Sequence, residues 1–307
     1  MSLYQKHRPN SLSAVKGNET LITSLEGMLS NIDTMPHVFL FVGNSGCGKT
    51  TIARILANRL GCVGNDLQEI DAGQFRGIDT IRDIRSNMQY APMEGSCRVY
   101  IMDEVHRSTS DAQHALLKIL EDTPKWVYFI LCTTDPQKLL PTVKGRCSTF
   151  TVTPLQDSVM VALLRRIAKR EGDVIEEEIL AQIASDSLGQ SRNAIQVLEQ
   201  VINTPPERRL EVAKRAAEQQ SKGIELCNAL INRKPWKMVA GILVSLKEQD
   251  NDAESVRRMV LGYCQSILLK GTINDQIAHV MECFMDNTYD SGFPAITYAA
   301  YSSLIQE

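Results

Sequence analysis

"HVFLFVGNSGCGKTTIARILANRL" at residues 37–60 joins a short apolar run to a glycine-rich turn and then to an amphipathic helical pattern. The turn, residues 43–50, matches the full G-x-x-x-x-G-K-[ST] pattern in its strand–turn–helix context. Its glycines let consecutive backbone amides face phosphate oxygens, and the helix N-terminus adds positive potential. The sequence therefore predicts a phosphate-binding loop. The alternative is a glycine-rich turn without a ligand.

The polar residues of this loop each have an expected partner. The ammonium of Lys49 would lie against the β- and γ-phosphates of a nucleotide, and the hydroxyl of Thr50 would ligate Mg²⁺. The other loop residues expected to contact the nucleotide are Asn44, Ser45, Gly46, Cys47, Gly48 and Thr51.

Further short apolar runs accompany the one that precedes the loop. They contain β-branched or aromatic residues and alternate with polar or helical sequence, which is typical of a parallel sheet with strands buried on both faces. We therefore predict an α/β domain with a five-stranded parallel sheet over residues 1–153. The further runs lie at residues 67–72, 98–103, 126–134 and 148–152.

The strand patterns stop after Pro154, and amphipathic helical patterns replace them. Two prolines in "NTPPERR", residues 203–209, interrupt the helical sequence, because proline cannot continue a helix. The pattern predicts a small helical domain over residues 154–204 and a second all-α domain over residues 205–307. The clearest helical patterns lie at residues 158–172, 176–189, 191–203, 236–247, 254–270 and 275–286.

Composition restricts the class of protein. The chain has 307 residues, 43% of them hydrophobic, which is enough for two or three domains with their own cores. The formal net charge is −3, so contact with nucleic acid needs a local basic surface. No signal peptide pattern and no membrane-length apolar run is found, so we expect an intracellular protein without membrane contact. Eight cysteines without a Cys-x-x-Cys pair indicate free thiols rather than zinc.

Two carboxylates end the apolar run in "VYIMDEVH", residues 99–106. At the carboxyl edge of a parallel sheet, Asp103 would hold Mg²⁺ and Glu104 would polarise water for attack on the γ-phosphate. This pair favours hydrolysis over transfer to a small acceptor, and so disfavours a small-molecule kinase. The alternative is that both acids only begin the next helix, where they suit its dipole.

The motifs of the chain, taken in order, are "YQKHRPNSLSAVKGNE", "GNSGCGKTTIARILA", "VYIMDEVHRSTSDAQHALLKILED", "FILCTTDPQKL", "KGRCSTF" and "GQSRNAIQ". They resemble the motifs of AAA+ clamp-loader ATPases, and most of all those of the gamma/tau subunits of the bacterial DNA polymerase III clamp loader. Replication factor C subunits are more distant relatives. The resemblance is strong over residues 1–200 and weak beyond. It implies a helical lid at residues 154–204 and an oligomerisation collar at residues 205–307.

The resemblance assigns roles to three residues that spacing does not. Thr134 would be sensor 1 and contact the γ-phosphate or the attacking water, although it also fits an ordinary strand-end hydroxyl. Arg146 would be the arginine finger that reaches the ATP of a neighbouring subunit, although most loop arginines are simply solvated. Arg192 would be sensor 2 within its own subunit. A cation in the first turn of a helix opposes the dipole by roughly 0.3–1 kcal/mol, which favours a functional role.

The resemblance also implies that the N-terminal segment covers the adenine of ATP. His7 replaces the usual aromatic residue of the family, and Gly145 replaces a serine before the finger. The zinc module of the bacterial relatives is absent, since residues 57–71 contain only Cys62. A compact, divergent chain fits a bacteriophage-encoded loader, a hypothesis on which no motif bears. The residues expected around the adenine are Tyr4, Lys6, His7, Arg8, Pro9, Val15 and Lys16.

The implied partners are a sliding clamp, primer-template DNA and other clamp-loader subunits in a ring-like, pentameric assembly in the cytoplasm of a bacterial or phage-infected cell. Candidates for contact with DNA phosphates are Arg76, Arg82 and Arg107, although solvated arginines are the common case. Two other functions stay open. One is a nucleotide-bound scaffold subunit with negligible turnover. The other is a different AAA+ DNA-remodelling ATPase, such as a branch-migration helicase.

Overall fold

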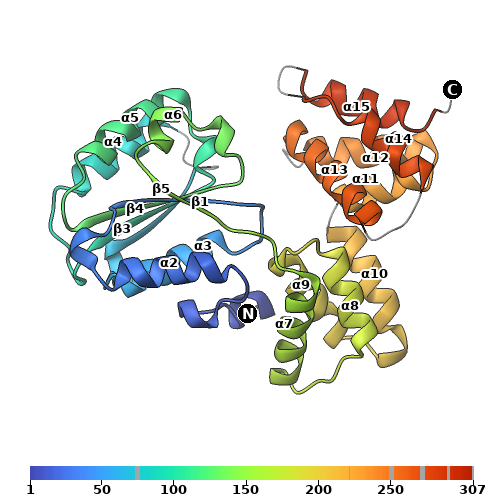
Figure 1. Cartoon of the computed structure of the whole chain (residues 1–307), viewed down its shortest axis with the longest axis horizontal. Coiled ribbons are helices and arrows are strands. Elements are labelled where there is room, and N and C mark those ends of the chain that lie inside the picture. Colours follow the sequence, from blue (N-terminus) through green and yellow to red (C-terminus); the bar gives the residue numbers. More distant parts are fainter. Residues whose placement is uncertain (73–76, 221, 249–251, 270–273, 289–290, 306–307) are drawn as a thin grey trace. The chain divides into compact units, whose positions relative to one another are not determined.

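The computed structural model describes residues 1–72, 77–220, 222–248, 252–269, 274–288 and 291–305 (Figure 1). The chain forms two compact units, residues 1–199 and residues 200–307. The first contains the sheet and the helices around it, and the second is helical. The division into three domains made from the sequence stays a prediction.

The sheet of the first unit has five parallel strands in the order β2-β3-β4-β1-β5. This confirms the predicted fold class. Since the strands are parallel, their carboxyl ends meet at one edge, where open α/β sheets bind their ligands. The strands are β1 (Val38–Val42), β2 (Leu67–Asp71), β3 (Arg98–Asp103), β4 (Val127–Thr133) and β5 (Ser148–Thr151).

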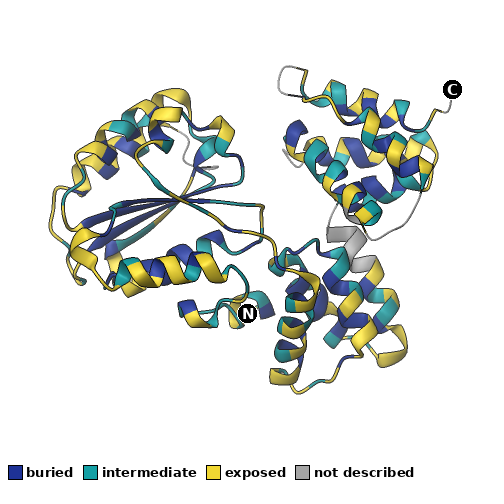
Figure 2. Cartoon of the chain, viewed as in Figure 1, coloured by how far each residue is buried: buried dark blue, intermediate teal, exposed yellow. Residues whose placement is uncertain are grey.

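Burial separates the central strands from the edge strands. All residues of β4 are buried, as are nearly all of β1 and β3 (Figure 2). In β5 exposed residues alternate with half-buried ones, and β2 has no buried residue. The prediction of strands buried on both faces therefore holds for the centre of the sheet. At the two edges, fewer neighbours cover each strand.

Two helical layers cover the sheet. Apolar side chains of α2 and α3 pack with Phe39, Phe41 and Ile130 on one face. Those of α4, α5 and α6 pack with Leu40 and Phe129 on the other, as the alternation along a strand requires. Figure 1 shows these two layers. The helices involved are α2 (Glu19–Leu29), α3 (Lys49–Arg59), α4 (Ile78–Asn87), α5 (Ser110–Glu121) and α6 (Pro141–Lys144).

Short helices and lid helices complete the first unit. The N-terminal segment and the start of α9 (Ser191–Ile202) reach the carboxyl edge of the sheet. The α-helices are α1 (Leu3–Lys6), α7 (Asp157–Arg170), α8 (Glu177–Asp186) and α9 (Ser191–Ile202), the last of which runs on into the second unit. The 3-10 turns are η1 (Leu12–Ala14), η2 (Ile32–Thr34), η3 (Gly64–Asp66), η4 (Val105–Arg107) and η5 (Pro136–Lys138).

The connection from α3 to β2 is short and contains η3. Its Asp66 is fully buried and accepts hydrogen bonds from the backbone N–H groups of Met93, Glu94 and Gly95 at 2.7–3.0 Å. Cys62 in the same connection is buried. Among the residues that the structure describes, no group of three or more His, Cys, Asp or Glu side chains is arranged to hold a metal ion.

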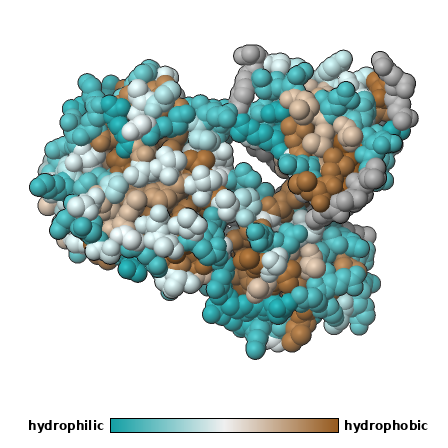
Figure 3. All heavy atoms as spheres, in the orientation of Figure 1, coloured by the Kyte–Doolittle hydropathy of each residue, from teal (hydrophilic) through white to brown (hydrophobic). Residues whose placement is uncertain are grey.

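The second unit is built around one apolar core that includes Leu230, Leu243, Val260 and Phe284. Figure 3 shows that apolar residues also reach part of its surface. None of the described helices has the length and apolar character needed to cross a membrane. Its elements are η6 (Pro206–Arg208), α10 (Arg209–Gln220), α11 (Lys222–Ile231), α12 (Trp236–Glu248), α13 (Ala253–Leu269), α14 (Asp275–Cys283) and α15 (Phe293–Ser302).

Candidate functional site

A cavity of about 460 Å³ lies at the carboxyl edge of the sheet, within the size range of ligand sites. The N-terminal segment, the predicted phosphate loop, the ends of β2 and β3 and the start of α9 all line it. The predicted site residues among its lining are Tyr4, Arg8, Ser45, Gly46, Gly48, Lys49, Thr50, Thr51, Asp103, Glu104 and Arg192.

Two glycines shape the phosphate loop. The N–H of Gly43 donates to the carbonyl of Thr133 at 3.2 Å, which ties the loop to β4. A Cβ at Gly43 would lie 2.3 Å from the carbonyl oxygen of Val152, so a side chain does not fit there. Gly48 has a φ of 105°, a conformation that glycine adopts readily, and α3 begins at the next residue.

Lys49 lies across this loop with only 5% of its surface exposed. Its Nζ donates to the carbonyl oxygens of Gly43 at 2.9 Å and Asn44 at 3.0 Å. An ammonium group has three N–H donors, so this anchoring keeps one for a phosphate oxygen. The charge is thereby held at a defined point on the cavity wall.

Thr50 and Asp103 meet beside Lys49. The Thr50 hydroxyl donates to Oδ2 of Asp103 at 2.6 Å, and Oδ1 of Asp103 accepts from the N–H of Glu104 at 3.0 Å. Hydroxyl and carboxylate oxygens are the protein ligands that Mg²⁺ prefers. The donor set therefore fits a Mg²⁺ ion shared with nucleotide phosphates.

Glu104 directly precedes η4 and has a φ of 49°, in the left-handed region that is uncommon for residues other than glycine. Its Oε2 accepts a hydrogen bond from Thr134 Oγ1 at 2.9 Å. The structure thus brings together the two residues expected to act on the attacking water. Thr134 itself is not among the residues that line the cavity.

The lid helix α9 begins against the phosphate loop. Its first hydroxyl, that of Ser191, donates to the carbonyl of Gly46 at 3.2 Å, and the N–H of Arg192 approaches the same oxygen at 3.4 Å. The guanidinium of Arg192 lies 5.1 Å from the centre of the Tyr4 ring. Arg8 lies 4.8 Å from the same ring centre, so the two cations and Tyr4 form one wall of the cavity.

Comparisons with known proteins address the family. The model of the DNA polymerase III delta subunit family matches residues 65–156. The gamma/tau subunit of DNA polymerase III from Mycobacterium bovis is 35% identical over 225 residues, which is 66% of this chain. The tau subunit from Escherichia coli is 36% identical over 221 residues, or 65% of this chain. The chain is a clamp-loader-like AAA+ protein.

The likeness covers only part of these relatives. The clamp-loader-like chain spans 39% of the length of the M. bovis protein and 34% of that of the E. coli protein. A solved structure, the Thermotoga maritima RuvB Holliday junction branch migration motor, matches with a TM-score of 0.65 and 18% identity. The match covers 86% of this chain and 91% of that one, and at this identity it concerns the fold alone.

Lys6 and His7 do not line the cavity but face the lid. Nζ of Lys6 lies 2.8 Å and Nε2 of His7 2.6 Å from the carboxylate of Glu171, which follows α7. The bonds from Lys6 and then His7 lower the pKa of Glu171. The N–H of Leu3 also donates to Glu199 of α9 at 3.1 Å. The segment expected over the adenine is therefore fastened to lid helices.

The remaining residues expected to contact the nucleotide are not among those that line the cavity. Val15 packs against the apolar core under α2 and α3, Lys16 is exposed, and Pro9 is half-buried. The thiol of Cys47 donates to the carbonyl of Asn44 at 2.8 Å, and burial raises its pKa. Among these side chains, that of Cys47 contacts the loop itself.

Arg146 lies after α6 and outside the cavity lining. Its guanidinium donates to the carbonyl of Thr142 at 2.9 Å and pairs with Glu121 of α5. The side chain is 34% exposed. The role of Arg146 as an arginine finger for a neighbouring subunit stays a prediction.

The three candidates for DNA contact have different surroundings. Arg82 on α4 is 68% exposed and pairs with Asp79 at 2.8 Å. Arg107 is half-buried at the end of η4, and its N–H donates to the carbonyl of Glu104 at 2.8 Å. Arg76 lies outside the residues that the structure describes.

Sequence reasoning missed several polar residues at or near the site, among them Arg54, Glu69 and His106. Arg54 and Glu69 line the cavity and form a two-pronged ion pair with both contacts at 2.5 Å. Arg54 follows Thr50 by one helical turn, so helical spacing could have indicated it. His106 lies 3.2 Å from Glu104, and its place in "DEVH" was its only signal.

Proposed function

We propose that this chain is the ATP-hydrolysing subunit of a DNA replication clamp loader, which opens a sliding clamp and places it on primer-template DNA. One observation carries the proposal. Lys49, the Thr50–Asp103 pair and the Glu104–Thr134 pair converge at one sheet edge, in a chain about one-third identical to DNA polymerase III gamma/tau subunits.

In this proposal the chain binds ATP through its phosphate loop. Backbone amides of the loop and Lys49 hold the β- and γ-phosphates, and Thr50 with Asp103 holds Mg²⁺. When bound, Mg²⁺ neutralises charge that develops on the phosphates. Tyr4, Arg8 and Arg192 close the cavity beside the base and the outer phosphates.

Hydrolysis then needs a base and a cation from a neighbour. Glu104 accepts a proton from the attacking water, and Thr134 orients the carboxylate. Arg146 of one subunit stabilises the charge on the γ-phosphate in the next, so the isolated chain has little activity. ATP favours a pentameric spiral that grips clamp and DNA, and hydrolysis releases the grip.

The test is steady-state phosphate release by the purified chain, alone and with its companion subunits, with single-stranded, duplex, primer-template and branched DNA. A preference for the primer-template junction supports the proposal. Stimulation by branched DNA instead would indicate that the chain is a branch-migration ATPase. Turnover that is absent in every assembly, with ATP still bound, would indicate a scaffold subunit.

A further inference from the structure

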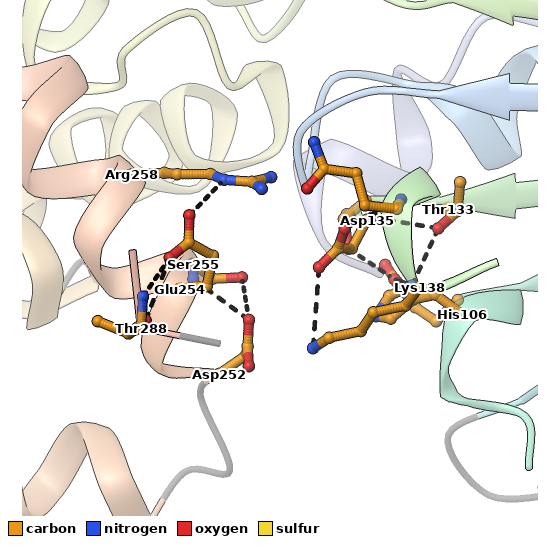
Figure 4. A network of polar contacts seen from close by, with 12 residues as sticks. His106, Thr133, Asp135, Lys138, Asp252, Glu254, Ser255, Arg258 and Thr288 are labelled. Carbon is orange, nitrogen blue, oxygen red and sulfur yellow. Dashed lines mark hydrogen bonds and ion pairs between the residues drawn. The ribbon is translucent and has the colours of Figure 1, made fainter. Parts of the chain in front are cut away.

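His106 lies in η4, two residues after Glu104, and the proposed function gives it no role. Its Nδ1 lies 3.0 Å from Thr133 Oγ1 and 3.2 Å from Glu104 Oε2. Figure 4 shows the ring directed at Thr133, beside Asp135 and Lys138. Only 13% of the side chain is exposed, so water has little access to replace these contacts.

The partners of Nδ1 determine where the ring carries its proton. The contact to Thr133 Oγ1 allows either direction, because a hydroxyl both donates and accepts, whereas the carboxylate of Glu104 can only accept. An unprotonated Nδ1 would set its lone pair against Glu104 Oε2. A hydrogen on Nδ1 removes this repulsion and directs a donor at Glu104 Oε2.

The ring is neutral as well as a donor. Burial lowers the pKa of His106 and outweighs the opposite effect of Glu104 and Asp135, while Lys138 and Arg107 lower it further. At neutral pH the tautomer with hydrogen on Nδ1 satisfies both contacts without adding a charge beside Glu104.

Two groups approach the same oxygen of Glu104. Thr134 Oγ1 at 2.9 Å and His106 Nδ1 at 3.2 Å both approach Oε2, and among the described residues no contact to Oε1 is found. Glu104 lines the cavity, and its side chain is 28% exposed. With both contacts on Oε2, the carboxylate is oriented and Oε1 is left to accept from a water in the cavity.

Thr133, which contacts the ring of His106, also supports the phosphate loop. Thr133 is fully buried at the end of β4, and its carbonyl accepts from the N–H of Gly43 at 3.2 Å. The same residue therefore fixes the ring through its hydroxyl and the start of the loop through its backbone. Thr133 thereby fixes the position of His106 relative to the phosphate loop.

We propose that His106 is a positioning residue, which donates from Nδ1 to Oε2 of Glu104 and sets the carboxylate for attack on the γ-phosphate. This inference rests on the proposed role of Glu104 as the base. His106 acts through Glu104 and does not itself touch the nucleotide.

The first test replaces the donor and then restores it. His106→Phe keeps a ring but removes the donor, and its kcat for ATP should fall about tenfold with an unchanged dissociation constant for ATP. His106→Asn places an amide N–H near the position of Nδ1 and should recover most of the loss. Equal kcat losses in both variants, or a loss of ATP binding, would overturn the proposal.

Two controls separate positioning from general damage. His37→Phe changes a histidine whose Nδ1 lies 2.8 Å from the carbonyl of Val127, at the opposite end of β4, and should leave kcat unchanged. In a Glu104→Gln background, His106→Phe should cause no further loss of turnover. A further loss there would show that His106 acts independently of Glu104.

A measurement without turnover distinguishes this inference from the proposed function. ¹⁵N NMR of the five histidines, with the His106 signals identified from His106→Asn, reports the tautomer in the free chain. Hydrogen on Nδ1 is expected, and hydrogen on Nε2 alone would overturn the contact to Glu104. Absent turnover in the wild-type assembly would instead overturn the proposed function and, with it, the catalytic part of this inference.

Discussion

Glu104 and Glu254 are both held by hydrogen bonds, but in opposite ways. Glu254, in the first turn of α13, is 2% exposed. Its Oε1 accepts from Arg257 and Arg258, and its Oε2 from Arg257 and from both the N–H and hydroxyl of Thr288, at 2.7–3.1 Å. Figure 4 shows Glu254 with Arg258 and Thr288. Glu104 accepts a hydrogen bond from Thr134 on Oε2, and the neutral ring of His106 lies 3.2 Å from the same oxygen.

The difference separates a structural carboxylate from one available for chemistry. Bonds from Arg257, opposed by burial, hold the pKa of Glu254 at about 2, so this side chain stays charged and saturated. Arg257 also donates to the carbonyls of Phe284 and Met285, which joins the start of α13 to the end of α14. Glu104 keeps one oxygen and part of its surface for a ligand.

The largest expected effect is on Glu104. Glu104→Gln should lower the rate of ATP hydrolysis by the assembled complex about 10²–10⁴-fold with ATP binding retained, because an amide cannot accept the proton of the water. Phosphate release and equilibrium binding measure the two properties. Glu177→Gln, which changes a 65% exposed partner of Arg165, is the matched control. A fully active Glu104→Gln complex would contradict the proposed base.

Glu254→Gln should instead lower stability without changing the rate of ATP hydrolysis. It leaves the chemistry intact but destabilises the second unit by about 2–3 kcal/mol, because two arginines lose a buried anionic partner. Urea unfolding followed by circular dichroism measures the loss. Glu282→Gln, at a side chain 82% exposed, should change stability by less than about 0.5 kcal/mol. An equal loss of unfolding free energy in the two variants would show that Glu254 has no special structural role.

The same carboxylate predicts a pH dependence. The pKa of Glu254 is lowered from 4.5 to about 2 in the folded state, so its contribution is fully present above pH 4.5 and is lost as the pH falls towards 2. Glu254→Gln should therefore flatten the decline of unfolding free energy across this range. An unchanged decline would show that other groups govern it, such as Asp66, whose pKa is also about 2 because backbone N–H bonds outweigh its burial.

A smaller effect is expected where the N-terminal segment meets the lid. Glu171→Ala removes the partner of Lys6 and His7 and should weaken ATP binding about two- to fivefold, more at low salt. Titration with a fluorescent ATP analogue measures it. Glu177→Gln on the same lid again serves as the control. Unchanged affinity would mean that the segment holds its place without Glu171.

The smallest effect concerns DNA. Arg82→Ala removes one exposed charge, and should lower primer-template stimulation of hydrolysis about twofold while leaving ATP binding unchanged. The salt dependence of stimulation should also become less steep. An identical response to DNA at every salt concentration would exclude Arg82 from the DNA-binding surface.

Local sequence was sufficient for the elements and for much of the cavity. Strand patterns at residues 37–42, 98–103 and 126–134 were confirmed because short apolar runs bounded by polar turns restrict the backbone locally. Lys49 and Thr50 followed from one continuous motif, whose glycines act on adjacent residues. The order of the strands did not follow from these patterns.

The sequence by itself determined the α/β class, the phosphate loop and the acidic pair, because each depends on residues next to one another in the chain. Only the tertiary structure decided that the ring of His106 lies between Thr133 and Glu104, and that Lys6 pairs with Glu171. Lys6 and Glu171 are 165 positions apart in the sequence, and no local pattern predicts a contact at such a separation. These contacts exist because the sheet brings the ends of β3 and β4 side by side and the lid folds back against α1.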